Sequence, residues 1–276
     1  MTIAEIHGKL RPYESMEDLL TSDVFGTFKY CSPKEGLIPF LEQAVTFDGS
    51  KADLAFLKDV VSAEYFFWPR SKSGREPDVI IILKLQNKEN VAINVEAKYF
   101  SGKHNIEVDD IDERDNKTVD ESEENKYHAG DQLVDQFWAL KKKLYTQKDI
   151  SDALKSCKMF YLFYITAHYI LPGQDVQETR DKDNNNDGKY FYWLNWARAW
   201  KICCSVKNEN SKINIMLDDL RQLLERKRLT ELALWNDIGD PFSTAPYFWV
   251  EEKMFWQIKT RYNYNHDGFF FWNKTI

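Results

Sequence analysis

Apolar positions recur at helical spacing in the first part of the chain. In the segment ESMEDLLTSDVFGTFKY, Leu19, Leu20 and Val24 fall on one face of a helix. Two following segments, SPKEGLIPFLEQAV and SKADLAFLKDVV, show shorter stretches of the same spacing. The pattern therefore predicts three helices, over residues 14–30, 32–45 and 50–61.

The period then changes to that of strands. AEYFFWPR, PDVIIILKL and NVAINVEAKYF are short runs rich in β-branched and aromatic residues. They predict three strands, over residues 63–70, 77–85 and 90–100. The polar segment QNKEN between the second and third runs suits a hairpin turn.

In the second half of the chain, the pattern predicts helices and a strand in turn. Leu133, Phe137, Leu140 and Leu144 predict one face of a helix in HAGDQLVDQFWALKKKLYT. KMFYLFYITAHYI is apolar and aromatic throughout, which is typical of a central buried strand. We expect a loop over 172–189, helices over 190–206 and 213–235, and no assignable element in the aromatic tail 240–276. This order predicts one α/β domain with a mixed central sheet flanked by helices.

Composition excludes several classes. The 43% apolar and 15% aromatic fractions can fill a core, which argues against global disorder. We expect no signal peptide and no membrane span, because the longest apolar run is too short, and hence a soluble, cytoplasmic protein. The four cysteines form no CxxC pair and show no zinc spacing with the histidines, so we expect neither structural zinc nor disulfides.

The negative charge is concentrated in one segment. Residues 107–126 contain ten acids and three bases, a net charge of −7, which equals the net charge of the whole chain. The remainder therefore sums to zero, and the overall acidity does not exclude a polyanionic partner. We expect a mobile loop here, and two roles stay open: a gate that repels a polyanionic partner, or a solvated loop with no role.

Charged residues interrupt the apolar hairpin. Alternation along a strand places Glu96 and Lys98 side by side on one face, and Asp78 opens the neighbouring strand. Two carboxylates that share a site repel each other unless a cation neutralises them, and oxygen ligands of this kind suit Mg²⁺. The alternative is an exposed strand face with a Glu–Lys ion pair. The apolar flanking positions predict a covered sheet, where unpaired charges are costly, and this favours the metal site.

Pro77-Asp78 followed by Glu96-Ala97-Lys98 resembles the signature of the PD-(D/E)XK nuclease superfamily. The resemblance covers about residues 13–168, the expected nuclease core, with a helical and aromatic extension over about 169–276. It implies a restriction-endonuclease-like fold, with Mg²⁺ (or Mn²⁺) bound by Asp78, Glu96 and the Ala97 carbonyl. It also implies that Lys98 positions water or stabilises the transition state.

Two further residues enter through the same resemblance. Members often carry a glutamine on the helix after the third strand, and Gln132, followed by Leu133, matches it loosely. The resemblance implies that Gln132 is a catalytic residue that orients the water or a phosphate. Members often place an acid on the first helix, for which Glu17 is the candidate and Asp18 the alternative. The long acidic stretch before Gln132 departs from the compact family pattern and leaves the start of that helix open.

These residues support two functional hypotheses. The first is a metal-dependent nuclease that acts on DNA, in restriction or anti-phage defence. The alternative is a catalytically inactive DNA-binding or scaffold subunit of a defence complex on the same fold. Either could form a homo-oligomer.

Other features are weaker. DNNNDG at 183–188 resembles half of a calcium loop, but Leu194 stands where a bidentate Glu is needed, so a polar turn is expected. Three tryptophans at helical spacing predict a core or interface stripe, with stacking on bases as the alternative: Trp193, Trp196 and Trp200. The basic clusters at 140–145 and 221–229 are either solvated faces or phosphate contacts. Two histidines that flank the acidic loop are expected at the surface: His104 and His128.

Overall fold

The computed structural model describes residues 16–87, 89–99, 129–206 and 210–231. All of these belong to one compact unit, Met1–Leu232. The acidic segment 107–126, His104, His128 and the aromatic tail lie outside the described residues. Within the described residues, no helix has both the length and the apolar character needed to cross a membrane.

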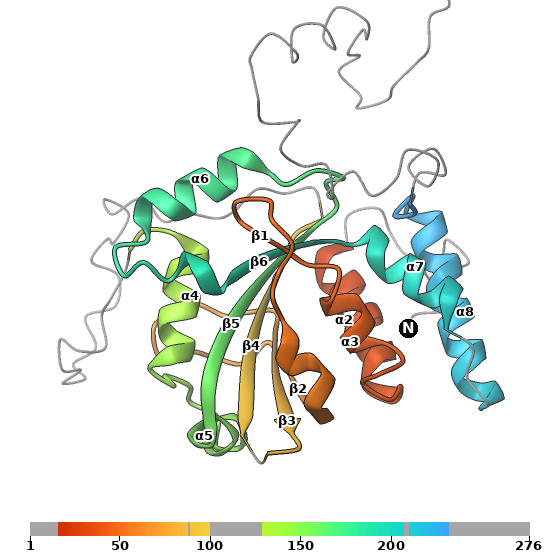
Figure 1. Cartoon of the computed structure of the whole chain (residues 1–276), viewed down its shortest axis with the longest axis horizontal. Coiled ribbons are helices and arrows are strands. Elements are labelled where there is room, and N and C mark those ends of the chain that lie inside the picture. The colour runs from red at the N-terminus through yellow and green to blue at the C-terminus, as the bar shows by residue number, and fades with distance from the viewer. Residues whose placement is uncertain (1–15, 88, 100–128, 207–209, 232–276) are drawn as a thin grey trace, which may run out of the picture. The chain divides into compact units, whose positions relative to one another are not determined.

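A six-stranded mixed sheet forms the centre of this unit, in the order β1-β6-β5-β4-β3-β2 (Figure 1). The strands are β1 (Val45–Thr46), β2 (Val60–Phe67), β3 (Val79–Leu85), β4 (Asn90–Ala97), β5 (Cys157–Thr166) and β6 (Phe191–Asn195). β2, β3 and β4 pair antiparallel, β4, β5 and β6 pair parallel, and β1 pairs antiparallel with β6. The predicted hairpin and the central strand are therefore confirmed, and the protein is an α/β protein with helices on its sheet.

Helices cover both faces of the sheet. The helical elements are α2 (Met16–Tyr30), α3 (Leu37–Leu41), η1 (Ala55–Asp59), α4 (Gln132–Lys141), α5 (Lys148–Lys155), α6 (Gly173–Lys182), η4 (Gly188–Tyr190), α7 (Ala197–Ser205) and α8 (Ser211–Arg226). Figure 1 shows α2, α3, α7 and α8 on one side of the strands and α4, α5 and α6 on the other.

The alternation of side chains along β3 explains how one sheet packs against helices on both of its faces. Ile81 packs into the core shared with α2, α3 and α8, whereas Ile80 and Ile82 pack into a second core with α4 and α5. All three isoleucines are fully buried, so apolar residues are favoured on both faces of β3 at these positions. Residues 80–82 therefore form a continuous apolar run, although they lie in a strand.

Several predicted elements differ from the observed ones. The helix expected over 50–61 is a short 3₁₀ helix that ends at Asp59, after which β2 begins at Val60. The helix expected over 32–45 is reduced to α3, and the helix expected over 213–235 is α8, which ends at Arg226. Strand β1 and helix α5 were not predicted.

The largest error concerns residues 172–206. The expected loop contains α6, a mostly polar helix whose buried residues are Val176 and Thr179, a stripe too narrow to show in the pattern. The helix expected from residue 190 begins as β6, because both faces of Phe191–Asn195 are buried and the apolar run has no period. Trp193 therefore lies on a strand and Trp200 on α7, so the tryptophans do not form one helical stripe. At 183–188 the chain forms the expected polar turn, in which Gly188 N donates to Asp183 Oδ2.

Candidate metal-dependent active site

The site lies at the carboxyl end of β4. Because β3 runs antiparallel to β4, with Val79 opposite Val95, the residue before β3 is brought next to the residues that end β4. That residue is Asp78, and its Oδ2 accepts a hydrogen bond of 2.7 Å from the backbone N–H of Ala97. The hairpin register therefore places the Asp78 carboxylate beside Glu96.

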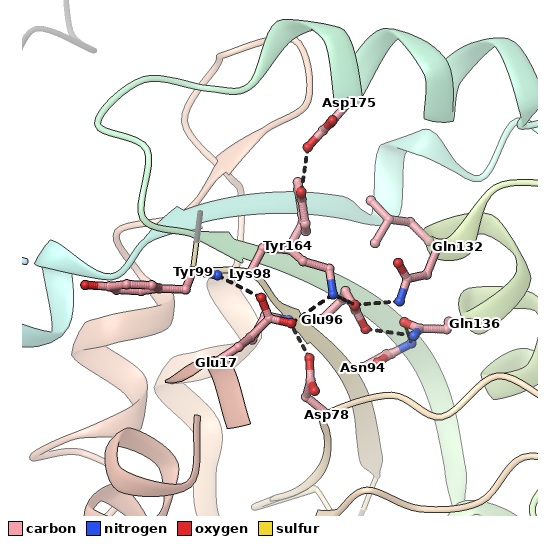
Figure 2. A network of polar contacts seen from close by, with 12 residues as sticks. Glu17, Asp78, Asn94, Glu96, Lys98, Tyr99, Gln132, Gln136, Tyr164 and Asp175 are labelled. Carbon is pink, nitrogen blue, oxygen red and sulfur yellow. Dashed lines mark hydrogen bonds and ion pairs between the residues drawn. The ribbon is translucent and has the colours of Figure 1, made fainter. Parts of the chain in front are cut away.

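Glu96 is held from three directions. Its side chain is 2% exposed and projects from the same strand face as Asn94, as the alternation predicted. Gln132 Nε2 donates to Oε1 at 2.6 Å and Gln136 Nε2 donates to Oε2 at 2.7 Å, while Lys98 Nζ lies 2.7 Å from Oε1 (Figure 2). Both oxygens of Glu96 therefore have donors from within the chain.

The two glutamines come from one face of α4. They are four residues apart, so their side chains lie one turn apart on the same side. The side chain of Asp131 caps this helix by accepting hydrogen bonds from Leu133 N at 2.9 Å and Val134 N at 3.1 Å. The cap fixes the first turn of α4, and with it the end of the helix that faces Glu96.

Lys98 bridges two carboxylates. Its Nζ lies 2.7 Å from Glu96 Oε1 and 3.0 Å from Glu17 Oε1. Glu17 comes from the first turn of α2, and its Oε2 accepts a hydrogen bond of 2.9 Å from Tyr99 N. On the other side, Trp196 Nε1 donates to the carbonyl of Lys98 at 3.0 Å. The lysine is therefore fixed through both its main chain and its ammonium.

Burial and charge set the ionisation of these groups. Burial raises the pKa of Asp78 to about 8, and the negative charge of Glu96 adds to the rise. Burial also raises the pKa of Glu96, although the neighbouring Lys98 opposes it. Burial alone would lower the pKa of Lys98, but Glu96 and Glu17 outweigh it, so the pKa is raised and the ammonium stays charged.

The donor set fits Mg²⁺. When Glu17, Asp78 and Glu96 are all ionised, the network holds three negative charges against the single positive charge of Lys98, an excess that a divalent cation would offset. No group of three or more His, Cys, Asp or Glu side chains close enough to hold a metal ion occurs in the described part of the chain. Two carboxylates, those of Asp78 and Glu96, with the Ala97 carbonyl, are enough for Mg²⁺, which keeps several waters, but do not suit a structural zinc site.

The predicted site residues converge. Asp78, Glu96, Lys98, Gln132 and Glu17 belong to one network of hydrogen bonds and ion pairs (Figure 2). Asp18, the alternative to Glu17, is exposed. The catalytic and metal-binding roles of these residues stay predictions.

Four residues around the site were not predicted as site residues from the sequence: Gln136, Asn94, Tyr164 and Asp175. Gln136 binds Glu96 and accepts a hydrogen bond of 3.3 Å from Asn94 Nδ2. Tyr164 lies opposite Glu96 in the parallel β4/β5 pair, and its hydroxyl donates to Asp175 of α6 at 2.6 Å. The spacing of the two glutamines in QLVDQ was a signal for Gln136, whereas the contact of Tyr164 with α6 required the fold.

Comparisons of this chain with protein-family models, with curated proteins and with solved structures find no match. The resemblance to PD-(D/E)XK nucleases therefore depends on five positions, Pro77, Asp78, Glu96, Ala97 and Lys98, together with the order of the elements around them.

Proposed function

We propose that the protein is a metal-dependent nuclease that hydrolyses phosphodiester bonds, with DNA as its substrate. One observation carries the proposal: Asp78, Glu96 and Lys98 meet in a buried network at the carboxyl end of β4. Buried charges of this kind are costly for folding, and clusters of groups with shifted pKa values are typical of functional sites. A role in restriction or anti-phage defence follows from the resemblance alone and belongs to the same proposal.

Each side chain has a role in this mechanism. Asp78, Glu96 and the Ala97 carbonyl would hold Mg²⁺, which supplies Lewis-acid activation of water and of the attacked phosphate. Gln132 and Gln136 fix the orientation of Glu96 through one hydrogen bond to each oxygen. Glu17 fixes Lys98 from the opposite side.

The charge of Lys98 distinguishes between two roles for this residue. A lysine that removes a proton from water must first be neutral, which requires a lowered pKa. The carboxylates of Glu96 and Glu17 raise the pKa of Lys98 instead. We assign Lys98 the second role, that of a positive charge held by Glu96 and Glu17 that stabilises negative charge developing on the phosphate.

Cleavage assays test the proposal directly. Plasmid and linear DNA are incubated with the full chain in Mg²⁺, Mn²⁺ or EDTA, and RNA serves as a second substrate. We expect cleavage only with a divalent cation, and a loss of about 100-fold or more in Lys98→Ala, as is typical when a group that stabilises transition-state charge is removed. Lys142→Ala is the matched control, because Lys142 is exposed at the far end of α4.

The outcome separates the two functional hypotheses. Wild-type turnover in Lys98→Ala would refute the mechanism. Absence of cleavage by the wild type on every substrate, with DNA binding retained, would favour the inactive DNA-binding or scaffold subunit. That alternative is consistent with a Glu96 whose oxygens are both hydrogen-bonded within the chain.

A further inference from the structure

His168 is the single histidine among the residues that the structure describes, and it lies two residues beyond the end of β5. Its main chain is fixed on both sides, because its N–H donates to Thr166 Oγ1 at 3.3 Å and its carbonyl accepts from Asn195 Nδ2. The preceding Ala167 N donates to Tyr99 O at 3.1 Å. The backbone at His168 is therefore tied both to β6 and to the segment that follows β4.

Side chains along β5 alternate between the two faces of the sheet as far as His168. Every second residue belongs to the core shared with α2 and α3: Phe163, Ile165 and Ala167. Of the residues between them, Tyr164 lies opposite Glu96 in the parallel β4/β5 pair. Residues that lie opposite each other on neighbouring strands point to the same face of the sheet. The alternation therefore places the His168 side chain on the face that carries Glu96.

The main chain also places His168 close to Lys98. Lys98 N donates to Ile165 O at 2.7 Å, which continues the parallel ladder and sets Lys98 beside Thr166, two residues before His168. Neighbouring strands are about 4.8 Å apart and a strand rises about 3.3 Å per residue, so the Cα atoms of Lys98 and His168 are roughly 8 Å apart. The two side chains are therefore close enough to contact one phosphate group.

The imidazole of His168 makes no hydrogen bond or ion pair within the described part of the chain. Its Nδ1 is buried without a partner, whereas Nε2 is neither enclosed nor bonded and the residue as a whole is half-buried. The chain reaches the surface here, because the next two residues, Tyr169 and Ile170, are 43% and 69% exposed. Buried polar atoms are normally hydrogen-bonded, so a purely structural role does not explain this ring.

Phosphodiester hydrolysis requires a proton donor at the oxygen that leaves. The oxygen of water forms a bond to phosphorus, the bond from phosphorus to the leaving oxygen breaks, and that oxygen takes up a proton to leave as an alcohol. Lys98 Nζ is held at 2.7 Å from Glu96 and 3.0 Å from Glu17, so its protons are directed at these carboxylates. Asp78 and Glu96 are ionised as metal ligands and carry no proton. The donor must therefore be another group.

We propose that His168 is this donor, the general acid of the reaction. Its imidazolium gives the Nε2 proton to the leaving oxygen as the bond to phosphorus breaks, which yields an alcohol and a neutral imidazole. One proton of the attacking water passes to solvent, and solvent returns one proton to Nε2, which is accessible. The proposal rests on the proposed function and adds a catalytic residue to it, on the β5 side of Lys98.

A substrate whose leaving group needs no proton tests this role. The products of the wild type show which end carries the phosphate, and hence which bridging oxygen leaves. A second oligonucleotide carries sulfur in place of that oxygen at the cleaved bond. A thiol ionises at about pH 8.5, so its thiolate leaves without a proton donor. The variants are His168→Ala and His168→Gln, whose amide keeps a hydrogen-bond donor but gives up no proton, and the control is Ile170→Ala.

We expect kcat on the oxygen substrate to fall about 100-fold or more in both His168 variants, as is typical when a general acid is removed, with KM close to that of the wild type. On the sulfur substrate both variants should cleave within about threefold of the wild type, because no proton is required. Ile170→Ala should match the wild type on both substrates. Thermal unfolding of each variant shows that it is folded, and His168→Gln provides the answer if His168→Ala is not.

The outcomes separate this role from the proposed function. Cleavage by the wild type, with an unchanged kcat in His168→Gln on the oxygen substrate, would overturn the role of His168 and keep the nuclease. An equal loss on the oxygen and sulfur substrates would also overturn it, because the ring would then act on the phosphate or the fold and not on the leaving group. Absence of metal-dependent cleavage by the wild type would overturn the nuclease, and the general acid with it.

Discussion

At the residue scale, the buried hydrogen bonds of Gln136 explain why a neutral amide stands in the core. Gln136 is 1% exposed; its Nε2 donates to Glu96 Oε2 and its Oε1 accepts from Asn94 Nδ2. Asn94 Oδ1 is buried and has no hydrogen-bond partner among the residues that the structure describes. The Asn94 amide is therefore held in this network by its contact with Gln136. The side chain acts as a positioning group for Glu96, and its removal affects both neighbours.

Gln136→Leu should weaken both folding and metal binding. The change keeps the volume but leaves the Nδ2 of Asn94 and one oxygen of Glu96 short of a partner, which costs about 1–3 kcal/mol of unfolding free energy for each group left unsatisfied. Urea denaturation measures the stability, and calorimetric titration measures Mg²⁺ affinity. Gln177→Leu, at an exposed position of α6, is the control. Unchanged Mg²⁺ affinity in Gln136→Leu would exclude the positioning role.

The shifted pKa of Asp78 predicts a pH-dependent stability in the absence of divalent cations. An Asp has a pKa of about 3.9 in an unfolded chain, whereas that of folded Asp78 is about 8. Between these values the folded state binds a proton at Asp78 that the unfolded state does not, so the contribution of Asp78 to stability is fully present below about pH 4 and is lost as the pH rises towards 8.

Asp78→Asn removes this loss. The amide oxygen can still accept the hydrogen bond from Ala97 N, and the side chain does not ionise. In urea denaturation with EDTA, we expect the variant to gain at least about 1 kcal/mol relative to the wild type between pH 5 and pH 8, because one unit of pKa shift corresponds to about 1.4 kcal/mol. Stabilities that change in parallel over this range would show that Asp78 carries no such shift.

At the element scale, the sequence predicts those elements that have a clear period, and those apolar runs that polar segments bound on both sides. In the β3–β4 hairpin, β3 is an apolar run and β4 places polar and apolar residues alternately, with a polar turn between them. The register of this hairpin brings Asp78 next to Glu96. Helix α6 and strand β6 could not be predicted, because a polar helix with two buried residues looks like a loop and a strand buried on both faces has no period. Glu17 was predicted through the resemblance alone, because its contact with Lys98 depends on the packing of α2 against the sheet, which no local pattern contains.

The cap of α4 gives a prediction at this scale. Asp131→Ala removes the acceptor for Leu133 N and Val134 N and frees the turn that carries Gln132. We expect a loss of about 1 kcal/mol or more in stability and a fall in DNA cleavage, because the amide that orients Glu96 is released. Asn210→Ala removes the cap of α8, where the exposed Asn210 accepts from Lys212 N at 3.0 Å, whereas the buried Asp131 also accepts from the Thr179 hydroxyl of α6. Asn210→Ala should lower the stability but leave DNA cleavage unchanged. If both variants cleave DNA equally at equal stability, the cap of α4 does not control the orientation of Glu96.

At the scale of the whole molecule, the site joins the two helix layers across the sheet. Glu17 reaches it from α2, on one face, and Gln132 and Gln136 reach it from α4, on the other. Asp78 and Glu96 come from the sheet between them. The unfolded chain does not bring these groups together, so a cation that binds them should bind the folded state alone.

Mg²⁺ should therefore stabilise the folded protein as a whole. A ligand that binds only the folded state adds about 2.7 kcal/mol at a concentration 100 times its dissociation constant, and raises the unfolding temperature accordingly. We expect Mg²⁺ to raise the midpoint of thermal unfolding of the wild type in the absence of DNA. Glu96→Gln, which removes a negative ligand, and Asp78→Asn should lose most of this increase, whereas Asp152→Asn, at an exposed acid of α5, should keep it. The rise in midpoint is specific because it depends on the carboxylates around Lys98. If the network only stabilises the fold and binds no cation, Mg²⁺ will shift the midpoint of the wild type no more than that of Glu96→Gln.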